Sequence, residues 1–322
     1  DISGVNSFND SFLARTAVTD GLNLGGNYYG NKCTKIKVQN CDGPIYIRNF
    51  LVNASTGTTQ NQNVGIEVNN SKVVLENCAS VRNKEAGFKF LNSAVTLSRS
   101  AFSYRNYDGT VTTRVAEKGV GFHAINSEIT LSSLASSSLA DIGDYQASGR
   151  DALFVASRNT KGIVLDNSKL TGGVQRTTTT RDTEGALISE LNNLVGIELN
   201  SSFAYVKGLI DVYGNKKGIV CEGSVFSYED LTVDGSQEQG ALANNSTLTF
   251  DSDSKIDSAY RSQLDFSGNS VHVDLASNSK FSFKPKENAA TSYGFTKYIN
   301  AFGGSAALKA AKNSVLDLYK AN

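Results

Sequence analysis

Apolar and polar residues alternate along most of the chain, in short runs separated by turn residues. In VGIEVNNSKVVLEN, Ile66 and Val68 share one side of an extended chain, and after the turn Val73 and Leu75 do the same. A period of two over four to six residues indicates strands, because an α-helix repeats its apolar positions about every 3.6 residues. The same alternation recurs in GFKFLNSAVTL and in GIVCEGSVFSYEDL. The pattern predicts an all-β chain of short strands.

The strands recur at a regular spacing. One serine follows each turn residue, with steps of 22, 34, 41, 34, 22, 22 and 24 residues between Ser71, Ser93, Ser127, Ser168, Ser202, Ser224, Ser246 and Ser270. A unit of about 22 residues that holds short strands and tight turns matches one coil of a parallel β-helix, in which stacked coils bury their inward side chains. We therefore expect a single-stranded parallel β-helix over residues 34–284, right-handed like most parallel crossovers.

The turn residues suit the corners of such coils. Asparagine tolerates the left-handed backbone conformation that tight corners need, and its side chain can bond to the equivalent residue one coil away. We expect this turn ladder to contain Asn70, Asn92, Asn126, Asn167, Asn245 and Asn269. Glycines precede the turns, and we expect a second sharp corner at Gly65, Gly87, Gly121, Gly162, Gly196, Gly218 and Gly240.

The two ends depart from the repeat. Residues 1–33 are rich in turn residues and are expected to form an N-terminal cap over the open end of the coils. Residues 285–322 form a separate C-terminal segment. There Ser305 suits a helix N-cap, and apolar residues recur at steps of three or four from Leu308 to Leu318. We predict a short amphipathic α-helix that lies over the last coil or contacts a partner.

Charge and composition narrow the classes of partner. Lys plus Arg and Asp plus Glu number 31 each, so the formal net charge is zero, which argues against binding nucleic acid by neutralising phosphates. No apolar run approaches the roughly 20 residues that span a bilayer, so we expect no membrane insertion. The chain begins at Asp1 and contains no Met, which is typical of a processed product or part of a longer protein.

Residues that could carry chemistry are few. Cys33, Cys41, Cys78 and Cys221 match no zinc-binding spacing, and a disulfide between Cys33 and Cys41 stays open. His123 and His272 each occupy a repeat strand, and we interpret both as ordinary strand residues. Parallel β-helices include many polysaccharide lyases and hydrolases, but the carboxylates of DSDSKID lack the glycine and glutamate of a calcium loop. We predict no catalytic residue, no metal site and no cofactor.

Function is expected where the spacing lengthens. Three consecutive units exceed 22 residues by 12, 19 and 12, and we place the insertions at 103–119, 139–162 and 172–193. Insertions at one point of a repeat project from one face of a solenoid, and tyrosine and arginine are favoured in contacts. The candidate contact residues are Tyr104, Arg105, Tyr107, Tyr145, Arg150, Asp151, Arg158 and Arg181.

The repeated Gly-apolar-x-x-x-Asn-Ser unit, with SYRNYD, GFHAINSEITLSS and SRNTKGIVLDNSKL, resembles right-handed β-helix virion proteins of tailed phages. The closest likeness is to tail, baseplate or fibre proteins of contractile-tailed cyanobacterial phages, over roughly residues 34–284. This resemblance implies a non-enzymatic structural or adhesive protein of the virion, commonly a homotrimer, that binds other virion proteins or a host cell-surface glycan. Two alternatives stay open: a tailspike-like polysaccharide lyase or hydrolase, and a secreted, extracellular bacterial adhesin.

Overall fold

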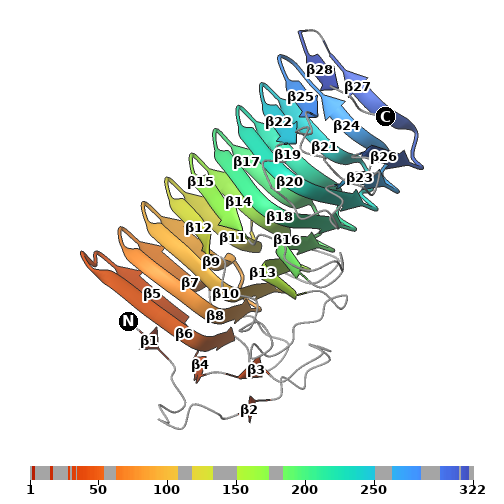
Figure 1. The fold of residues 1–322 in the computed structure, drawn as a ribbon. Coiled ribbons are helices and arrows are strands. Elements are labelled where there is room, and N and C mark those ends of the chain that lie inside the picture. The colour runs from red at the N-terminus through yellow and green to blue at the C-terminus, as the bar shows by residue number, and fades with distance from the viewer. Residues whose placement is uncertain are drawn as a thin grey trace, which may run out of the picture.

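The computed structural model describes residues 2–3, 15–16, 28–29, 31–33, 35–53, 63–107, 118–132, 151–173, 184–250, 263–283, 298–311 and 313–318. Within these ranges the chain forms strands and turns and no helix. The strands stack into a row of coils from the N-terminal to the C-terminal end (Figure 1). The prediction of an all-β chain with parallel, stacked strands is confirmed, and the arrangement is consistent with a parallel β-solenoid.

The first sheet has eleven strands. β1 (Ile2–Ser3) pairs with β5 in the antiparallel sense, and the other neighbours are parallel. Each parallel strand contributes one side of a coil and pairs with the equivalent strand of the next coil. In order, these strands are β5 (Lys35–Gln39), β7 (Val64–Asn69), β9 (Ala86–Leu91), β11 (Val120–Ile125), β14 (Lys161–Asp166), β17 (Val195–Asn200), β19 (Lys217–Glu222), β21 (Gln239–Asn244), β24 (Val271–Leu275) and β27 (Ala306–Ala310).

The second sheet has fifteen strands and forms the rest of each coil. Register shifts between Ser98 and Ala101, and between Val206 and Leu209, mark a bend that divides this side into two halves. One strand spans both halves in β6 (Pro44–Asn53), β8 (Lys72–Val81), β10 (Ala94–Tyr104), β18 (Phe203–Tyr213) and β20 (Val225–Asp234).

Elsewhere the halves are separate strands. The first half is β12 (Glu128–Ser132), β15 (Lys169–Gly173), β22 (Thr247–Phe250), β25 (Lys280–Phe283) or β28 (Val315–Leu318). The second half is β13 (Asp151–Ser157), β16 (Glu184–Glu190), β23 (Gln263–Ser267) or β26 (Tyr298–Phe302). β4 (Asn31–Cys33) pairs with β6, and β2 (Arg15–Thr16) and β3 (Tyr28–Tyr29) form a separate antiparallel pair.

The core lies between the two sheets. Alternate residues of each strand point inward, and the strands of the first sheet repeat one burial pattern, as in β7, β9, β11 and β17. Aromatic side chains fill the interior: Phe88 and Phe122 stack from one coil to the next with ring centroids 4.4 Å apart, and Phe154 meets Phe122 from the opposite sheet at 3.7 Å with its ring tilted. Burial of this continuous apolar column is the main favourable term that holds successive coils together.

The predicted C-terminal helix is wrong. Its residues form β27 and β28, which pair in parallel with β24 and β25. Leu308 continues the inward row that contains Val273, so the period of two governs this segment as well. Asn313, in the middle of the expected helix, adopts a φ of 64°, and this turn interrupts the backbone where a helix would have to continue. Apolar spacing over so short a stretch fits both periods, and stacking on the previous coil decides between them.

The described parts of the three expected insertions belong to the coils. Tyr104 ends β10, Asp151 begins β13, and Glu184–Glu190 is β16. The described ranges stop at Tyr107, at the corner that leads back to the first sheet, and at the ends of β12 and β15, at the bend of the second sheet. The extra residues of the lengthened units therefore follow two different points of the coil rather than one. The expected N-terminal cap, residues 1–33, lies almost entirely outside the described residues.

Candidate functional site

Each coil has one corner where the first sheet passes into the second. The corner residue has a φ between 46° and 64° in every described coil, which is the left-handed region. Asn70, Asn92, Asn126, Asn167 and Asn245 are exposed at this corner, together with Asn40, Ser201, Gly223, Asn278 and Asn313. Their amides bond along the row: Asn167 Nδ2 donates to Asn126 Oδ1 at 2.9 Å, and Asn70 Nδ2 donates to Asn40 Oδ1 at 3.1 Å.

A row of buried serines lies directly behind these corner residues. The backbone N–H of Ser71 donates to Ser93 Oγ at 3.2 Å, and the same bond recurs from each serine to the next as far as Ser314. The hydroxyl in turn donates to the carbonyl two residues earlier, as Ser93 Oγ does to Leu91 O. Because these hydroxyls are used within the fold, the Asn-Ser motif serves the coil rather than a ligand.

A second ladder lies at the corner where the second sheet returns to the first. Asn83, Asn106, Asn159, Asn192 and Asn215 are at most 2% exposed. The N–H and Nδ2 of Asn83 both donate to Asn106 Oδ1, at 2.9 and 2.8 Å. The same pair of bonds leads from Asn106 to Asn159, from Asn159 to Asn192 and from Asn192 to Asn215. Asn269, expected in the exposed ladder, belongs here instead, because its Oδ1 accepts from Ser236 N.

The repeated glycines face this inner ladder. None of the seven has positive φ, and all lie within or at the start of first-sheet strands rather than at a corner. A Cβ at Gly87 would lie 2.8 Å from Asn106 Nδ2, and one at Gly162 would lie 2.8 Å from Asn192 Nδ2. Glycine is required because the ladder amide occupies the space that a Cβ would need.

The residue before each inner asparagine is the unusual feature of this corner. It also adopts positive φ: 60° at Arg82, 50° at Arg105, 55° at Arg158 and 53° at Leu191. The later coils place glycine there, at Gly214, Gly235, Gly268 and Gly303. A side chain with a Cβ costs roughly 1–2 kcal/mol in this conformation, and arginine lacks the local hydrogen bonding that helps asparagine. Three consecutive coils therefore carry arginine against the local backbone preference.

These arginines form one row. Arg82 N donates to Tyr104 O at 3.1 Å, Arg105 N to Ser157 O at 3.2 Å, and Arg158 N to Glu190 O at 3.0 Å, so they are equivalent positions of adjacent coils. Adjacent parallel strands lie about 4.8 Å apart, which sets the spacing of the row. Arg82 and Arg105 are partly exposed and Arg158 is exposed. The row presents three cationic side chains on one edge of the molecule.

The Tyr104 ring lies beside the arginine row. Its side chain is 5% exposed, and the guanidinium carbons of Arg105 and Arg158 lie 5.1 and 6.0 Å from its ring centroid. Cation–π contacts of this kind orient a guanidinium while leaving its N–H groups available. Neither Arg105 nor Arg158 forms an ion pair within the described residues. By contrast, Arg48 pairs with Glu76 at 2.8 Å and Lys161 pairs with Glu198 at 2.8 Å.

Further along the same edge the surface becomes apolar. Leu191 is 38% exposed, and Tyr213, which is in register with Glu190 of the preceding coil, is 45% exposed. The Tyr213 ring lies beside the bare backbone of Gly235, where an added Cβ would be 3.6 Å from its Cε2. We call the set Arg82, Tyr104, Arg105, Arg158, Leu191 and Tyr213 the Arg–Tyr edge. It joins a cationic half to an apolar, partly aromatic half.

The candidate contact residues are distributed as follows. Tyr104, Arg105 and Arg158 belong to the Arg–Tyr edge, and Tyr107 is 9% exposed at the same corner. Asp151 is the first residue of β13. Three others lie outside the described residues: Tyr145, Arg150 and Arg181. The sequence does carry a signal for the missed Arg82 and Leu191, because each precedes an asparagine that stands four residues before a repeated glycine.

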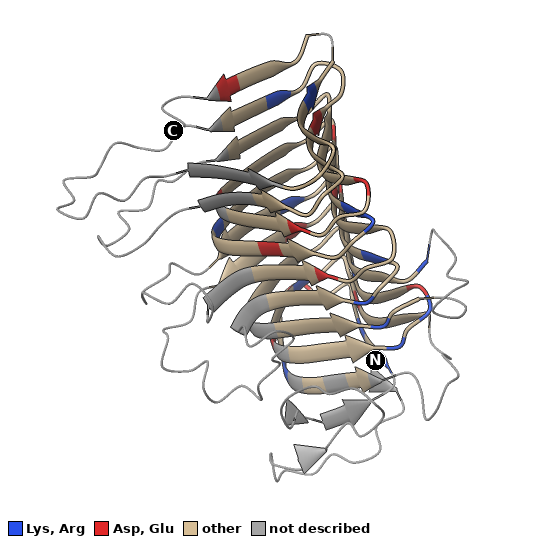
Figure 2. Cartoon of the chain, turned by 90° about the vertical axis from the view of Figure 1, so that its right-hand side faces the viewer, with Lys and Arg blue, Asp and Glu red and all other residues tan. Residues whose placement is uncertain are grey.

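Several charged groups outside the Arg–Tyr edge are paired with one another. On the first sheet, His123 Nε2 and Asp166 Oδ2 lie 2.7 Å apart, and Asn200 Nδ2 donates to Asp166 Oδ1 at 2.8 Å. Figure 2 shows basic and acidic residues interspersed along the stack of coils. His272 is buried, with Nε2 2.7 Å from Gly303 O. The described residues contain no group of three His, Cys, Asp or Glu side chains that could hold a metal ion.

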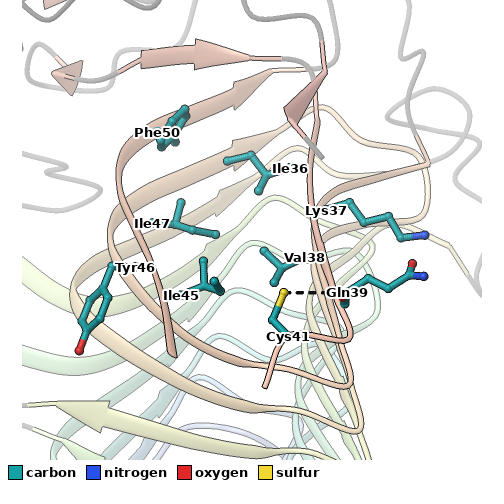
Figure 3. Close-up of a pocket in the computed structure, with 9 residues that line it drawn as sticks. All are labelled: Ile36, Lys37, Val38, Gln39, Cys41, Ile45, Tyr46, Ile47 and Phe50. Atoms are coloured by element: carbon teal, nitrogen blue, oxygen red, sulfur yellow. Dashed lines mark hydrogen bonds between the residues drawn. The ribbon is translucent and has the colours of Figure 1, made fainter. Parts of the chain in front are cut away.

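A cavity of about 540 Å³ opens between β5 and β6. Its lining is mainly apolar, from Ile36, Val38, Ile45, Ile47 and Phe50, whereas the Lys37 and Gln39 side chains point away from it (Figure 3). Cys41 is a free thiol whose Sγ donates to Gln39 O at 3.5 Å, as the serines do in later coils. This cavity continues the solenoid interior and has few polar groups to orient a ligand.

Comparisons with protein-family models, curated proteins and solved structures find no match to this chain. The described residues include no helix long and apolar enough to cross a membrane. The Arg–Tyr edge is therefore the feature of the molecule that bears most directly on function.

Proposed function

We propose that the protein is a right-handed parallel β-helix that acts as a non-enzymatic structural or adhesive component and binds a partner through the Arg–Tyr edge. The setting we favour is the virion of a tailed phage, in a tail, baseplate or fibre. The usual hand of parallel crossovers supports the right-handed assignment. The likeness of the repeat unit to phage β-helix proteins supports the setting.

One observation carries the binding role. Arg105 and Arg158 are held at positive φ and have no carboxylate partner in the described part of the chain. Backbone strain in a folded protein persists where the surroundings enforce it, and it gathers at functional sites. Glycine satisfies the same corner in four later coils, so the fold does not need arginine there. An external anionic or polar partner would explain why these coils have arginine at this corner.

The two ladders suit the proposed role of a rigid support. From the coil of Asn83 to the coil of Asn215, buried hydrogen bonds join successive coils at both corners. A buried hydrogen bond resists rearrangement, because breaking it would leave an unpaired group in the interior. Side chains on such a scaffold keep a fixed spacing, which favours the recognition of a repeating surface.

The test has two arms. Purified protein is applied to an array of bacterial surface polysaccharides, and bound protein and released reducing ends are both measured. We expect retention without release, and retention weakened by Arg105→Gly with Arg158→Gly. Release of reducing ends by the wild-type protein would establish the polysaccharide-degrading alternative. Mass spectrometry and imaging of particles from the source then ask whether the chain is present in a virion, and its absence from particles would refute that setting.

A further inference from the structure

We infer that the Arg–Tyr edge binds an extended acidic polysaccharide, with its carboxylate or sulfate groups against the arginine row and a sugar ring against Tyr213. This inference rests on the proposed adhesive function and names the ligand class of the same site.

The geometry of the arginine row favours a ligand with repeating anionic groups. Arg82, Arg105 and Arg158 occupy equivalent positions of three adjacent coils, so the row spans about 10 Å along the stack. A planar guanidinium presents paired N–H donors that match the two oxygens of a carboxylate or sulfate. A linear polymer parallel to the stack can meet successive guanidinium groups with successive acidic sugars.

The apolar half of the edge favours a sugar polymer over a simple polyanion. Leu191 and Tyr213 are 38% and 45% exposed, so part of the apolar surface of each is open to solvent. The C–H face of a pyranose packs against an aromatic ring, which removes apolar surface of both from water. Leu191 and Tyr213 extend over the glycines at the next two positions of the row: an added Cβ would lie 2.8 Å from Leu191 Cδ2 at Gly214 and 3.6 Å from Tyr213 Cε2 at Gly235. The two side chains therefore offer an apolar surface for the sugar ring.

Charge also decides which part of the polymer lies on which half of the edge. The carboxylates nearest the apolar half are Glu190, which precedes Leu191, and Asp234, which is in register with Tyr213. Glu190 is 7% exposed and accepts a hydrogen bond from Ser157 Oγ at 2.9 Å. Like charges repel, so the acidic groups of the ligand belong on the Arg82–Arg158 half and a neutral part of the polymer on the Tyr213 half.

The experiment measures binding of the full chain by biolayer interferometry at two salt concentrations. The probes are polygalacturonate, the same polymer with its carboxyl groups reduced, dextran sulfate, neutral dextran, poly-glutamate and single-stranded DNA. We expect polygalacturonate or dextran sulfate to bind, the affinity to fall as salt rises, and the carboxyl-reduced polymer and neutral dextran to bind at least tenfold more weakly. If polygalacturonate binds more tightly than dextran sulfate, the favoured group is a carboxylate; if dextran sulfate binds more tightly, it is a sulfate.

Variants locate the binding. Arg105→Gly combined with Arg158→Gly should lower the affinity at least tenfold, and Tyr213→Ala should weaken the polysaccharide but not poly-glutamate. Arg48→Ala is the matched control, because Arg48 also lies beside a tyrosine, 5.9 Å from the Tyr46 ring, but is paired with Glu76 and lies outside the edge. If the double glycine variant does not fold, Arg105→Asn with Arg158→Asn keeps a residue that tolerates positive φ.

The outcomes separate this inference from the proposed function. Equal binding of neutral and acidic polymers, insensitive to the double variant, overturns the inference and leaves an adhesive function in place. Binding of poly-glutamate or DNA as tight as that of polysaccharide also overturns it, because the ligand would then be any polyanion. Failure to bind any polysaccharide, on the array or here, overturns both this inference and the adhesive form of the proposed function, and detection of the chain in particles then tests the structural form.

Discussion

Replacing Arg105 and Arg158 with glycine should remove binding without destabilising the fold. The structure places both residues at positive φ, at 50° and 55°, in a position where other coils use glycine. If the arginines are present for a partner, their loss should leave the free energy of unfolding almost unchanged. If they hold the coils together, their loss should lower it clearly.

The magnitude follows from four terms. Relief of the left-handed backbone gains about 1–2 kcal/mol at each site. The extra freedom of glycine in the unfolded chain loses about 0.5–1 kcal/mol at each site. Loss of the cation–π contact with Tyr104 costs another 0.5–1 kcal/mol or so at each site. Removal of the repulsion between two unit charges about 4.8 Å apart in water returns roughly 0.9 kcal/mol. These terms nearly cancel, and their sum favours a double variant stabilised by about 1 kcal/mol.

The assay is urea unfolding followed by circular dichroism, with the slope of the transition compared between the two proteins. An unchanged slope shows that the midpoint shift reports stability and not a change in the unfolded state. A loss of more than about 2 kcal/mol would refute the reasoning, since it exceeds the cation–π terms that the structure shows. In that case the arginines would be structural, and their backbone strain would not indicate a binding role.

Three further predictions concern the coils themselves. Asn106→Ala should destabilise the protein by about 2–4 kcal/mol in urea unfolding, because it leaves the buried Asn83 N–H without its acceptor. Gly87→Ala should be still more damaging, since its Cβ would lie 2.8 Å from Asn106 Nδ2 and 2.9 Å from Gly121 O, whereas Gly43→Ala meets nothing within 4 Å. Burial, and secondarily the charge of Glu222, raises the pKa of Cys221 from 9.0 to about 12. Between these values the unfolded chain loses the thiol proton first, so stability should fall with rising pH by up to about 1.4 kcal/mol per pH unit, and Cys221→Ala should flatten this part of the profile.

Each of these predictions has a contradicting result. Wild-type stability in Asn106→Ala would show that water or another group replaces the ladder acceptor. Equal urea midpoints for Gly87→Ala and Gly43→Ala would mean that the inner ladder moves to accommodate a methyl group. A pH profile of the same slope in Cys221→Ala would assign the alkaline loss of stability to other groups, such as the buried Tyr228, whose pKa burial also raises.

The alternation of apolar residues and the serine spacing sufficed to predict stacked parallel strands, with one error: the serine row continues from Ser246 to Ser279, whereas Ser270 directly precedes β24 at the opposite corner. The inner ladder was missed for a physical reason. The steps between Asn83, Asn106, Asn159 and Asn192 are 23, 53 and 33 residues, so the asparagines show no constant period along the sequence. The glycines were misplaced for a related reason. Their requirement arises from asparagines at the opposite corner, and no local pattern shows which side chain will occupy that space.

At the candidate site, the sequence identified three of the residues, but it assigned them to inserted loops. Tyr104, Arg105 and Arg158 were selected as members of inserted loops, whereas the structure places them in the strand or corner of regular coils. Arg82 lies in a unit of ordinary length, so a search confined to lengthened units passed over it. Its equivalence to the other two depends on pairing between strands, which only the stacked arrangement reveals.

The serine ladder has a direction that bears on how the chain folds. Every N–H of the row is donated toward the C-terminal neighbour, from Cys41 to Ser71 at 3.0 Å and onward. A coil therefore reaches its full set of bonds only after the following coil has docked. During synthesis, which proceeds from the N-terminus, each arriving coil completes the one before it. Ser314 differs from the other serines of the row, because its N–H donates to Ala311 O at 3.2 Å, within its own turn.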